Sequence, residues 1–270
     1  MDLKIYIINL EKSKDRKATM IRNILNIPRF NIYIDGDLKI NRKDEINLNF
    51  NFFKASVARD IEKGRINIKN YNPFILRFIR GRELSFSERA CFHSHYRLWE
   101  ECAKSSNPFI ILEDDVTFEK EFCNILNIYK SNFEYVRLMY LFHRNVKKIN
   151  EKFHISFGNI SGTQGYYITP NGARKFLKHA KNYLHCVDNY MDMFFIHGVL
   201  NIIYTPFIIR SDEISLNSTI QDSNKEKIPF FYKITREISR IYFFIFRKNL
   251  FLFFNFFKLK KLKSIESRFN

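Results

Sequence analysis

The sequence predicts an α/β fold with a largely parallel sheet, and three observations support this class. Uninterrupted apolar runs within residues 4–10 and 109–112 are typical of strands buried on both faces. Segments with helical spacing of apolar residues follow or precede these runs. The 270 residues are 46% hydrophobic with only 8 Gly and 6 Pro, which suits a packed core better than a disordered chain.

The first elements form a strand–helix–strand unit. Residues 4–10 are predicted to be a strand, and apolar residues at helical spacing then continue to Leu25 before Pro28 ends the helix. A second short strand over residues 30–34 ends at Asp35-Gly36. Residues 37–82 mix Asn, charge and isolated apolar positions without a clean period, so no element is assigned to them.

A long helix and a buried strand follow. Ser85 and Glu88 have the spacing of a capping box, in which each side chain bonds the backbone of the other residue. Apolar residues recur on one face from Cys91 to Cys102, and Pro108 precedes the strand at 109–112.

The last part of the predicted core alternates strands and helices. Residues 135–141 and 165–168 are predicted strands, and Thr169-Pro170 begins a helix with Pro at its first position. A short helix over 188–195 and a strand over 202–205 complete the core.

Charge and cysteine content restrict the class of protein. With 45 Lys and Arg against 28 Asp and Glu, the net charge of +17 favours anionic partners such as nucleotides, nucleic acid or acidic lipid headgroups. The four cysteines form no CxxC pair, so neither a zinc knuckle nor a disulfide framework is expected. The apolar run near the amino terminus is too short for a secretory signal, which predicts a cytoplasmic chain.

The composition changes at residue 228. Residues 228–270 hold 11 of the 30 Phe, and 10 basic residues against 2 Glu. Ile234, Ile238, Ile241 and Ile245 share one helical face, with arginines opposite, and charges interrupt any stretch long enough to span a bilayer. We therefore expect a domain over 1–227 and a basic amphipathic tail over 228–270 that lies on an anionic membrane. The alternative is a terminal helix packed on the domain.

Three adjacent acids, Glu113-Asp114-Asp115, follow the strand at 109–112. Clustered carboxylates repel one another unless a cation or hydrogen-bond donors neutralise them, and ligands of open α/β sheets bind beyond strand carboxyl ends. Oxygen ligands suit Mg²⁺ or Mn²⁺, which bind together with substrate phosphates, so the predicted substrate is a nucleoside diphosphate. The alternative is an exposed acidic turn that caps the next helix.

Several motifs in order carry a family resemblance. They are Ile8-Asn9-Leu10 with Asp15-Arg16; Glu88, Cys91, Ser94-His95 and Trp99; Ile111-Leu112-Glu113-Asp114-Asp115-Val116; and Gly165-Tyr166, Gly172-Ala173 and Val187-Asp188. In this order and spacing, over roughly residues 4–220, the chain resembles glycosyltransferase family 25, which contains bacterial lipooligosaccharide galactosyltransferases. The family commonly has two glycines around its Glu-Ile before Cys91, and this chain has Ser87 and Ala90 there, which argues against close backbone approach to a ligand.

The resemblance implies a GT-A-like enzyme that transfers galactose from UDP-galactose, with inversion, to a lipooligosaccharide or other glycolipid acceptor. It implies Mn²⁺ or Mg²⁺ bound by Asp115 and Glu113. The residues implied for binding the nucleotide sugar are Asn9, Leu10, Arg16, Asp35, Ser94, His95, Glu113 and Asp114. Asp114 has the alternative of only holding its loop, and His95 that of a buried core histidine.

An inverting displacement requires a base for the acceptor hydroxyl. Asp188, at the start of a predicted helix, is the candidate, and Asp192 one turn later is the reserve. A helix N-cap is the alternative role for Asp188.

The family resemblance and the basic tail together imply that the protein lies at the inner face of the cell membrane.

Two other classes of function compete with this interpretation. The charge and the 17% aromatic content permit a nucleic-acid-binding protein, but no reader motif is present, so no nucleic acid is expected as a partner. A metal-dependent hydrolase or nucleotidyltransferase would use the same acids.

Overall fold

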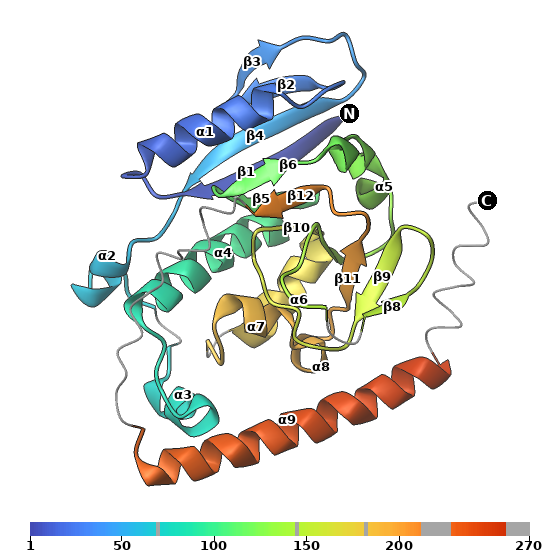
Figure 1. Ribbon diagram of the computed structural model, residues 1–270. Coiled ribbons are helices and arrows are strands. Elements are labelled where there is room, and N and C mark those ends of the chain that lie inside the picture. Colours follow the sequence, from blue (N-terminus) through green and yellow to red (C-terminus); the bar gives the residue numbers. More distant parts are fainter. Residues whose placement is uncertain (69–70, 144–145, 181–182, 212–227, 258–270) are drawn as a thin grey trace.

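The computed structural model describes residues 1–68, 71–143, 146–180, 183–211 and 228–257 (Figure 1). The strands are β1 (Asp2–Asn9), β2 (Asn31–Ile34), β3 (Asp37–Ile40), β4 (Asn47–Lys54), β5 (Phe109–Glu113), β6 (Val116–Phe118), β7 (Tyr135–Arg137), β8 (Val146–Lys148), β9 (Phe153–Ser156), β10 (Gly165–Ile168), β11 (Asn201–Tyr204) and β12 (Ile209–Ser211). The helices are α1 (Lys14–Leu25), α2 (Ala58–Glu62), α3 (Pro73–Arg80), α4 (Phe86–Lys104), the 3₁₀ helix η1 (Lys120–Asn124), α5 (Ile125–Tyr129), α6 (Pro170–Ala180), α7 (Val187–Met191), α8 (Phe194–His197) and α9 (Phe230–Phe257).

In the described part of the chain, ten strands form one mixed sheet in the order β3-β2-β4-β1-β5-β10-β7-β11-β9-β8. The neighbours of β1, which are β4 and β5, both run parallel to it. β10 runs antiparallel to both β5 and β7, and β12 pairs with β6 in a separate ribbon. The predicted α/β class is therefore confirmed, and the carboxyl ends of β1, β4 and β5 meet at one edge.

The amino-terminal strand–helix–strand unit is present, but β2 does not pair with β1. β4 lies between them and is parallel to both strands. Its sequence alternates Asn with apolar residues, and Leu48 and Phe50 are fully buried. β3 and β4 lie in the stretch that sequence analysis left unassigned, whereas β2 is the short strand it predicted. The hairpin turns at Asp35 and Gly36, both with positive φ (48° and 89°), as a two-residue type I′ turn requires.

Helix α4 begins as predicted. Ser85 accepts a hydrogen bond from the Glu88 amide, and the Glu88 carboxylate accepts one from the Ser85 amide. The face of α4 that carries Phe92, Trp99 and Cys102 is buried, and the helix packs against α6. This capped start fixes the register of a helix that carries several predicted site residues.

Two predictions for the second half need correction. The strand expected over 135–141 is shorter, because β7 ends at Arg137. The single helix expected over 188–195 is two short helices, α7 and α8, separated at Asp192 and Met193. β10 and α6 begin where the sequence predicted, and the Thr169 hydroxyl accepts from the Gly172 amide.

Helix α9 confirms a helical carboxyl-terminal segment as far as residue 257. It crosses the molecule below α3, α7 and α8 in Figure 1 and contacts α3 and α8. Thr235 and Ser239 are buried and Phe243 lies against Phe195, so one face of the helix packs on the domain. The isoleucine face expected to contact a membrane is exposed, with Ile238 and Ile241 58% and 59% accessible.

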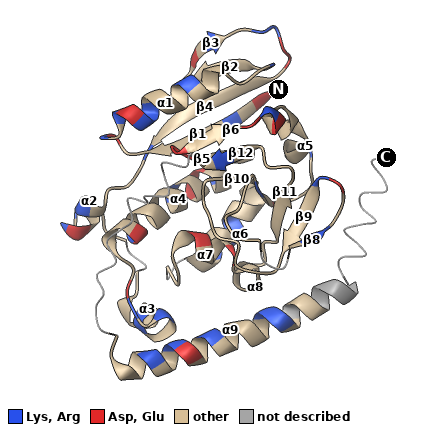
Figure 2. Ribbon diagram, in the orientation of Figure 1, with Lys and Arg blue, Asp and Glu red and all other residues tan. Residues whose placement is uncertain are grey.

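The basic residues of α9 do not all lie opposite the isoleucines as expected. Arg247 turns toward the domain, where it donates to the side chain of Asn159 at 2.6 Å. Arg240 is largely exposed, and Figure 2 shows Lys and Arg positions, in blue, along the ribbon of the helix. None of the helices in the described ranges combines the length and apolarity needed to cross a bilayer. The expected domain boundary at 227/228 adjoins residues 212–227, which are outside the described residues.

Candidate active site at the carboxyl edge of the sheet

The acidic trio lies where the sequence predicted, at the carboxyl edge of the sheet. Glu113 is the last residue of β5 and pairs in register with Ile8 of β1. Asp114 and Asp115 form the turn into β6. Strand β1 ends at Asn9, so its last residues reach the same edge.

Asp114 is held by the amino-terminal unit. Its Oδ2 accepts from Asn9 Nδ2 at 2.6 Å, and its Oδ1 pairs with Arg16 Nη1 at 3.1 Å. The structure thus brings together Asn9, Arg16 and Asp114, all three predicted to bind the nucleotide sugar. The hydrogen bonds favour the alternative that Asp114 holds its loop. Leu10, half-buried, adjoins this group.

Glu113 sits above a buried aromatic chain of hydrogen bonds. The Trp99 indole donates to the Tyr166 hydroxyl at 2.8 Å, and that hydroxyl lies 2.9 Å from Nδ1 of His95. Nε2 of His95 lies 3.5 Å from Glu113 Oε1. If the Tyr166 hydroxyl donates its hydrogen bond to Nδ1, the proton of the neutral His95 ring is on Nε2 and faces the Glu113 carboxylate.

The environment of Glu113 stabilises its charged form. Burial alone would raise its pKa, but His95, the Thr163 hydroxyl, which donates to Oε1, and the charge of Arg16 lower it below the usual value. Glu113 is therefore a carboxylate that is already held in place by neighbours on α4 and on the segment before β10.

Asp115 is in the opposite situation. Burial, together with the charges of Glu113 and Asp114, raises the pKa of Asp115 to about 7. Its Oδ1 is buried without a hydrogen-bond partner. An uncompensated buried carboxylate oxygen is costly, and a divalent cation at the acidic trio would satisfy it. The residues present therefore fit a metal ion.

Cys91 brings a sulfur atom close to His95 and Glu113. Within the described chain, ligand atoms of Cys91, His95 and Glu113 lie within 4.8 Å of one another. Burial, and then the charges of Glu113 and Asp188, raise the pKa of Cys91 well above its usual value, so the thiol is neutral. Sequence analysis expected the ligands Glu113 and Asp115, whereas this group contains a nitrogen of His95 and the sulfur of Cys91 beside Glu113 and does not include Asp115.

Asp188 faces the same corner from α7. It lies in the first turn of this helix and is half-buried. The N-cap position is occupied by Cys186, so the alternative N-cap role of Asp188 is wrong. The charges of Asp188 and Asp115 both raise the pKa of the Cys91 thiol, so Asp188 and the acidic trio share this neighbour.

Asp192, the reserve base, is structural. It is fully buried, and Arg137 Nη2 pairs with its Oδ1 at 2.9 Å. Asn201 Nδ2 donates to Oδ1 at 2.7 Å, and the amides of Ile160 and Ser161 donate to Oδ2. These donors occupy both carboxylate oxygens, so the prediction of Asp192 as a reserve base is wrong. Asp192 instead positions the loop that leads to Thr163.

Ser94 and Asp35 also have roles other than those predicted. Ser94 is buried, donates to the Ala90 carbonyl and accepts from the Ser56 amide, so it fixes the loop after β4 against α4. Asp35 is three strands away from Glu113, roughly 14 Å at the usual strand spacing. Its carboxylate accepts from the Phe52 amide and pairs with Lys17.

A family model and several known proteins are similar to this chain. The family model described as Glycosyltransferase family 25 (LPS biosynthesis protein) matches residues 2–191 of the 270. The chain belongs to glycosyltransferase family 25. The resemblance inferred from the motifs is therefore confirmed.

Curated relatives of this family 25 chain carry the same family name. Glycosyltransferase 25 family members of Aedes aegypti and Anopheles gambiae are 26% and 24% identical over 64% and 71% of the chain. These matches cover 28% and 31% of the insect proteins, so the chain spans about three tenths of their length. A human protein named inactive glycosyltransferase 25 family member 3 is 32% identical over 36% of the chain and 18% of its own length.

A solved structure also matches the family 25 chain in outline. Mouse xyloside xylosyltransferase 1, in its apo form, has a TM-score of 0.37 and 8% identity over 72% of this chain and 80% of its own. A score of this size supports no argument about the site.

Sequence analysis missed two residues of the family 25 site. Arg137 is buried and joins Asp192 to the carbonyl groups of Ser161 and Gly162. An arginine inside an otherwise apolar strand was a signal that could have found it, since buried arginine requires a partner. Thr163, which bonds Glu113, carries no comparable signal because its contact depends on the loop path.

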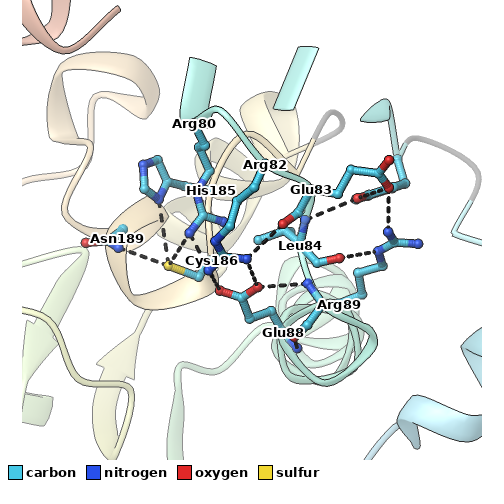
Figure 3. Close-up of polar contacts among 11 residues, drawn as sticks. Arg80, Arg82, Glu83, Leu84, Glu88, Arg89, His185, Cys186 and Asn189 are labelled. Carbon is cyan, nitrogen blue, oxygen red and sulfur yellow. Dashed lines mark hydrogen bonds and ion pairs between the residues drawn. The ribbon is translucent and has the colours of Figure 1, made fainter. Parts of the chain in front are cut away.

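A charged cluster anchors the start of α4 in this family 25 chain (Figure 3). Arg82 donates to both carboxylate oxygens of Glu88 at 2.7 and 2.8 Å, and Arg80 lies 3.6 Å from it. Beside them, Glu83 pairs with Arg89 at 2.8 Å. The cluster therefore joins α3 to the helix that carries Cys91 and His95.

Replacing Glu88 by Gln is expected to lower stability in a pH-dependent way. Burial alone would raise the pKa of Glu88, but hydrogen bonds from Arg82 and from the Ser85 amide lower it from 4.5 to about 2. Because the pKa is lower in the folded state, the charged carboxylate stabilises the folded protein at pH values above the unfolded-state pKa of 4.5. This stabilisation is about 3 kcal/mol at neutral pH and is lost as the pH falls from 4.5 toward 2. Urea unfolding should show the largest gap between wild type and Glu88→Gln at pH 7 and a smaller gap at pH 3.5. A gap that does not change with pH would contradict this assignment.

Proposed function

We propose that this family 25 member transfers galactose from UDP-galactose to a lipid-linked oligosaccharide, with inversion at the anomeric carbon. The observation that carries the proposal is the carboxyl edge of the sheet, where Asp115 Oδ1 is buried without a hydrogen-bond partner two residues after Glu113, the last residue of β5. Nucleotide-sugar transfer in a GT-A-like sheet requires such a site for a cation and a diphosphate beyond the carboxyl ends of the strands.

In this proposal, Asp115 and Glu113 hold Mn²⁺ or Mg²⁺. The ion supplies Lewis-acid stabilisation of the charge that develops on the leaving nucleotide. His95 can present Nε2 as a further ligand when its proton is on Nδ1, where the Tyr166 oxygen accepts it. The Thr163 hydroxyl orients Glu113 in either case.

The amino-terminal unit binds the nucleoside in this proposal. Asp114 holds the side chains of Asn9 and Arg16 in place through hydrogen bonds. The donors that these two side chains do not use, together with the Leu10 backbone, would contact the nucleoside beside the acidic trio. Arg16 remains 38% exposed and keeps donors available for a ligand. Asp35 is too remote for a part in catalysis and contributes only if the nucleoside extends along this edge.

Asp188 accepts the proton of the acceptor hydroxyl. Arg137 Nη2 reaches the backbone carbonyl oxygen of Asp188 at 3.4 Å, whereas the Asp188 carboxylate interacts with the Cys186 thiol. A half-buried carboxylate at the open side of α7 can meet an acceptor, whereas Asp192 below it cannot.

We infer a lipid-linked acceptor because one face of the molecule, along α9, is suited to contact with a membrane. The described part of α9 holds five basic residues and one acid, and its isoleucines are exposed. Basic residues near anionic headgroups contribute roughly 1 kcal/mol each. We place the protein at the inner surface of the cell membrane, where α9 lies in the headgroup layer.

Glutamates on the exposed face of α9 are expected to weaken membrane binding. Ile241→Glu/Ile245→Glu removes apolar area at two accessible positions and adds two like charges, so affinity for vesicles of phosphatidylcholine with one quarter phosphatidylglycerol should fall at least about tenfold. Cosedimentation measures this. Leu38→Glu, on β3 at the other end of the molecule in Figure 1, is the matched control. Equal binding of all three proteins would refute the role of α9.

A donor screen tests the function itself. The full chain is incubated with UDP-, GDP- and CDP-sugars, Mn²⁺ and an oligosaccharide acceptor, and both nucleotide release and acceptor mass are measured. Transfer gives UDP and an acceptor one hexose larger. Free sugar or nucleoside monophosphate without a larger acceptor would indicate a hydrolase, and no turnover with any donor would place the chain with the relative named inactive.

A further inference from the structure

Helix α3 exposes large apolar side chains next to α9. Phe74 and Phe78, one turn apart, are 71% and 47% accessible, which is high for phenylalanine in a helix that packs against another. The helix itself is well defined, with Pro73 at its first position, an Asn72 side-chain cap and Gly81 at its end with φ of 78°. The exposure is thus a property of a formed helix.

A groove runs between the two helices. Its volume is about 630 Å³, and Phe74, Phe78 and Ile79 of α3 face Ile238, Tyr242 and Phe243 of α9 across it. Almost all of the lining is apolar, so the groove offers hydrogen-bond partners to no polar ligand. This size is within the range of small-molecule sites, and the lining suits a hydrocarbon chain.

Charges around the groove are predominantly basic. Arg77 on α3 and Arg240 on α9 are 45% and 69% exposed, and Lys233 and Lys248 are also exposed. Arg77 pairs with Glu83 at 2.6 Å. The acid on the described part of α9 is Glu237, which pairs with Arg236 and Arg240. Figure 2 shows blue segments on both helices. A second copy of the chain would bring two basic rims together, whereas anionic headgroups complement such a rim.

We propose that α3 and α9 form one membrane-docking face and that the groove between them holds an acyl chain of an anionic bilayer lipid. The inference rests on the proposed membrane contact of α9 and adds a second helix and a lipid site to it. Headgroups lie against the basic rim, and Phe74 and Phe78 enter the acyl region beside Ile238 and Tyr242. Contact through two helices fixes the orientation of the domain on the bilayer, which one helix alone would leave free to roll about its axis.

Vesicle binding by α3 variants tests the inference. Phe74→Glu/Phe78→Glu alters two exposed side chains and should raise the dissociation constant for the phosphatidylcholine–phosphatidylglycerol vesicles at least about tenfold, because both rings lose their burial in lipid. Leu38→Glu should bind as the wild type does. If Phe74→Glu/Phe78→Glu binds normally while Ile241→Glu/Ile245→Glu does not, α9 docks alone, and this inference fails while the proposed membrane contact stands.

A fluorescence measurement addresses the groove directly and does not depend on a disruptive variant. Phe78→Trp places an indole at the groove, and Trp99, the chain's natural tryptophan, is fully buried. Lipids brominated on their acyl chains should quench the introduced indole by at least half and leave Leu38→Trp unquenched. Absence of quenching in bound protein would overturn the acyl site. Light scattering that shows a wild-type dimer and a Phe74→Glu/Phe78→Glu monomer would overturn it in favour of contact between copies.

Discussion

Asp115→Asn is expected to abolish metal-dependent binding of UDP-galactose. Asp115 Oδ1 is buried without a hydrogen-bond partner, and the amide of asparagine lacks the negative charge with which the carboxylate would hold the ion. Donor affinity in the presence of Mn²⁺ should fall by more than about a hundredfold, since even an outer-shell partner of a metal ligand is typically worth 10–100-fold. Titration calorimetry with and without Mn²⁺ measures this directly.

The control for this variant is Asp37→Asn. Asp37 is an exposed acid on β3, away from the trio, and its replacement makes the same change of charge. It should leave donor binding as in the wild type. Retention of Mn²⁺-dependent binding by Asp115→Asn would remove Asp115 from the proposed metal site.

Asp188→Asn should separate binding from turnover. The amide is close in size to the carboxylate but cannot take a proton from an acceptor hydroxyl, so turnover should fall by about 10²–10⁴-fold, the usual worth of a general base. Donor affinity should stay within about twofold of the wild type, because Asp188 lies on α7 and the nucleotide residues lie on β1, α1 and β5. Steady-state rates and donor titration on the same preparation measure the two quantities.

Asp37→Asn again gives the reference for an unrelated loss of charge. A normal turnover rate for Asp188→Asn would exclude Asp188 as the base. A parallel loss of donor affinity and turnover would instead assign Asp188 to substrate binding.

Local signals predicted the parts of the fold that depend on short segments. The capping box at Ser85 and Glu88 fixes the start of α4 through bonds within four residues. The position of Glu113 followed from an apolar strand ending in acids, because parallel strands bring their carboxyl ends to one edge. For the same reason Asn9 and Asp114, 105 residues apart, could be expected near each other.

Features that depend on distant segments could not be predicted in this way. The buried state of Asp192 results from Arg137, Asn201 and the 160–161 amides, which no sequence spacing connects. Strand β4 was missed because Asn is unfavourable in strands, although Leu48 and Phe50 have the alternation of a strand with a buried face.

The C-terminal helix packs on the domain, which was the alternative expected for it, and its contact with a membrane stays a prediction. Hydrophobic spacing alone cannot decide which of two apolar faces packs inward, since α9 has aromatic and aliphatic residues around much of its circumference. The structure resolves this by packing the face with Thr235, Ser239 and Phe243 on the domain. The isoleucines and several aromatic residues of the helix stay outside.

The outward isoleucines and phenylalanines of α3 and α9 also govern how the protein behaves once it is extracted from cells. A contiguous apolar surface in plain buffer promotes precipitation and adhesion to plastic and resins. A mild nonionic detergent or a short-chain phospholipid during chromatography would shield it, and moderate salt would weaken adventitious retention of nucleic acid by the +17 chain. Crystallisation trials should therefore include amphiphiles from the first purification step.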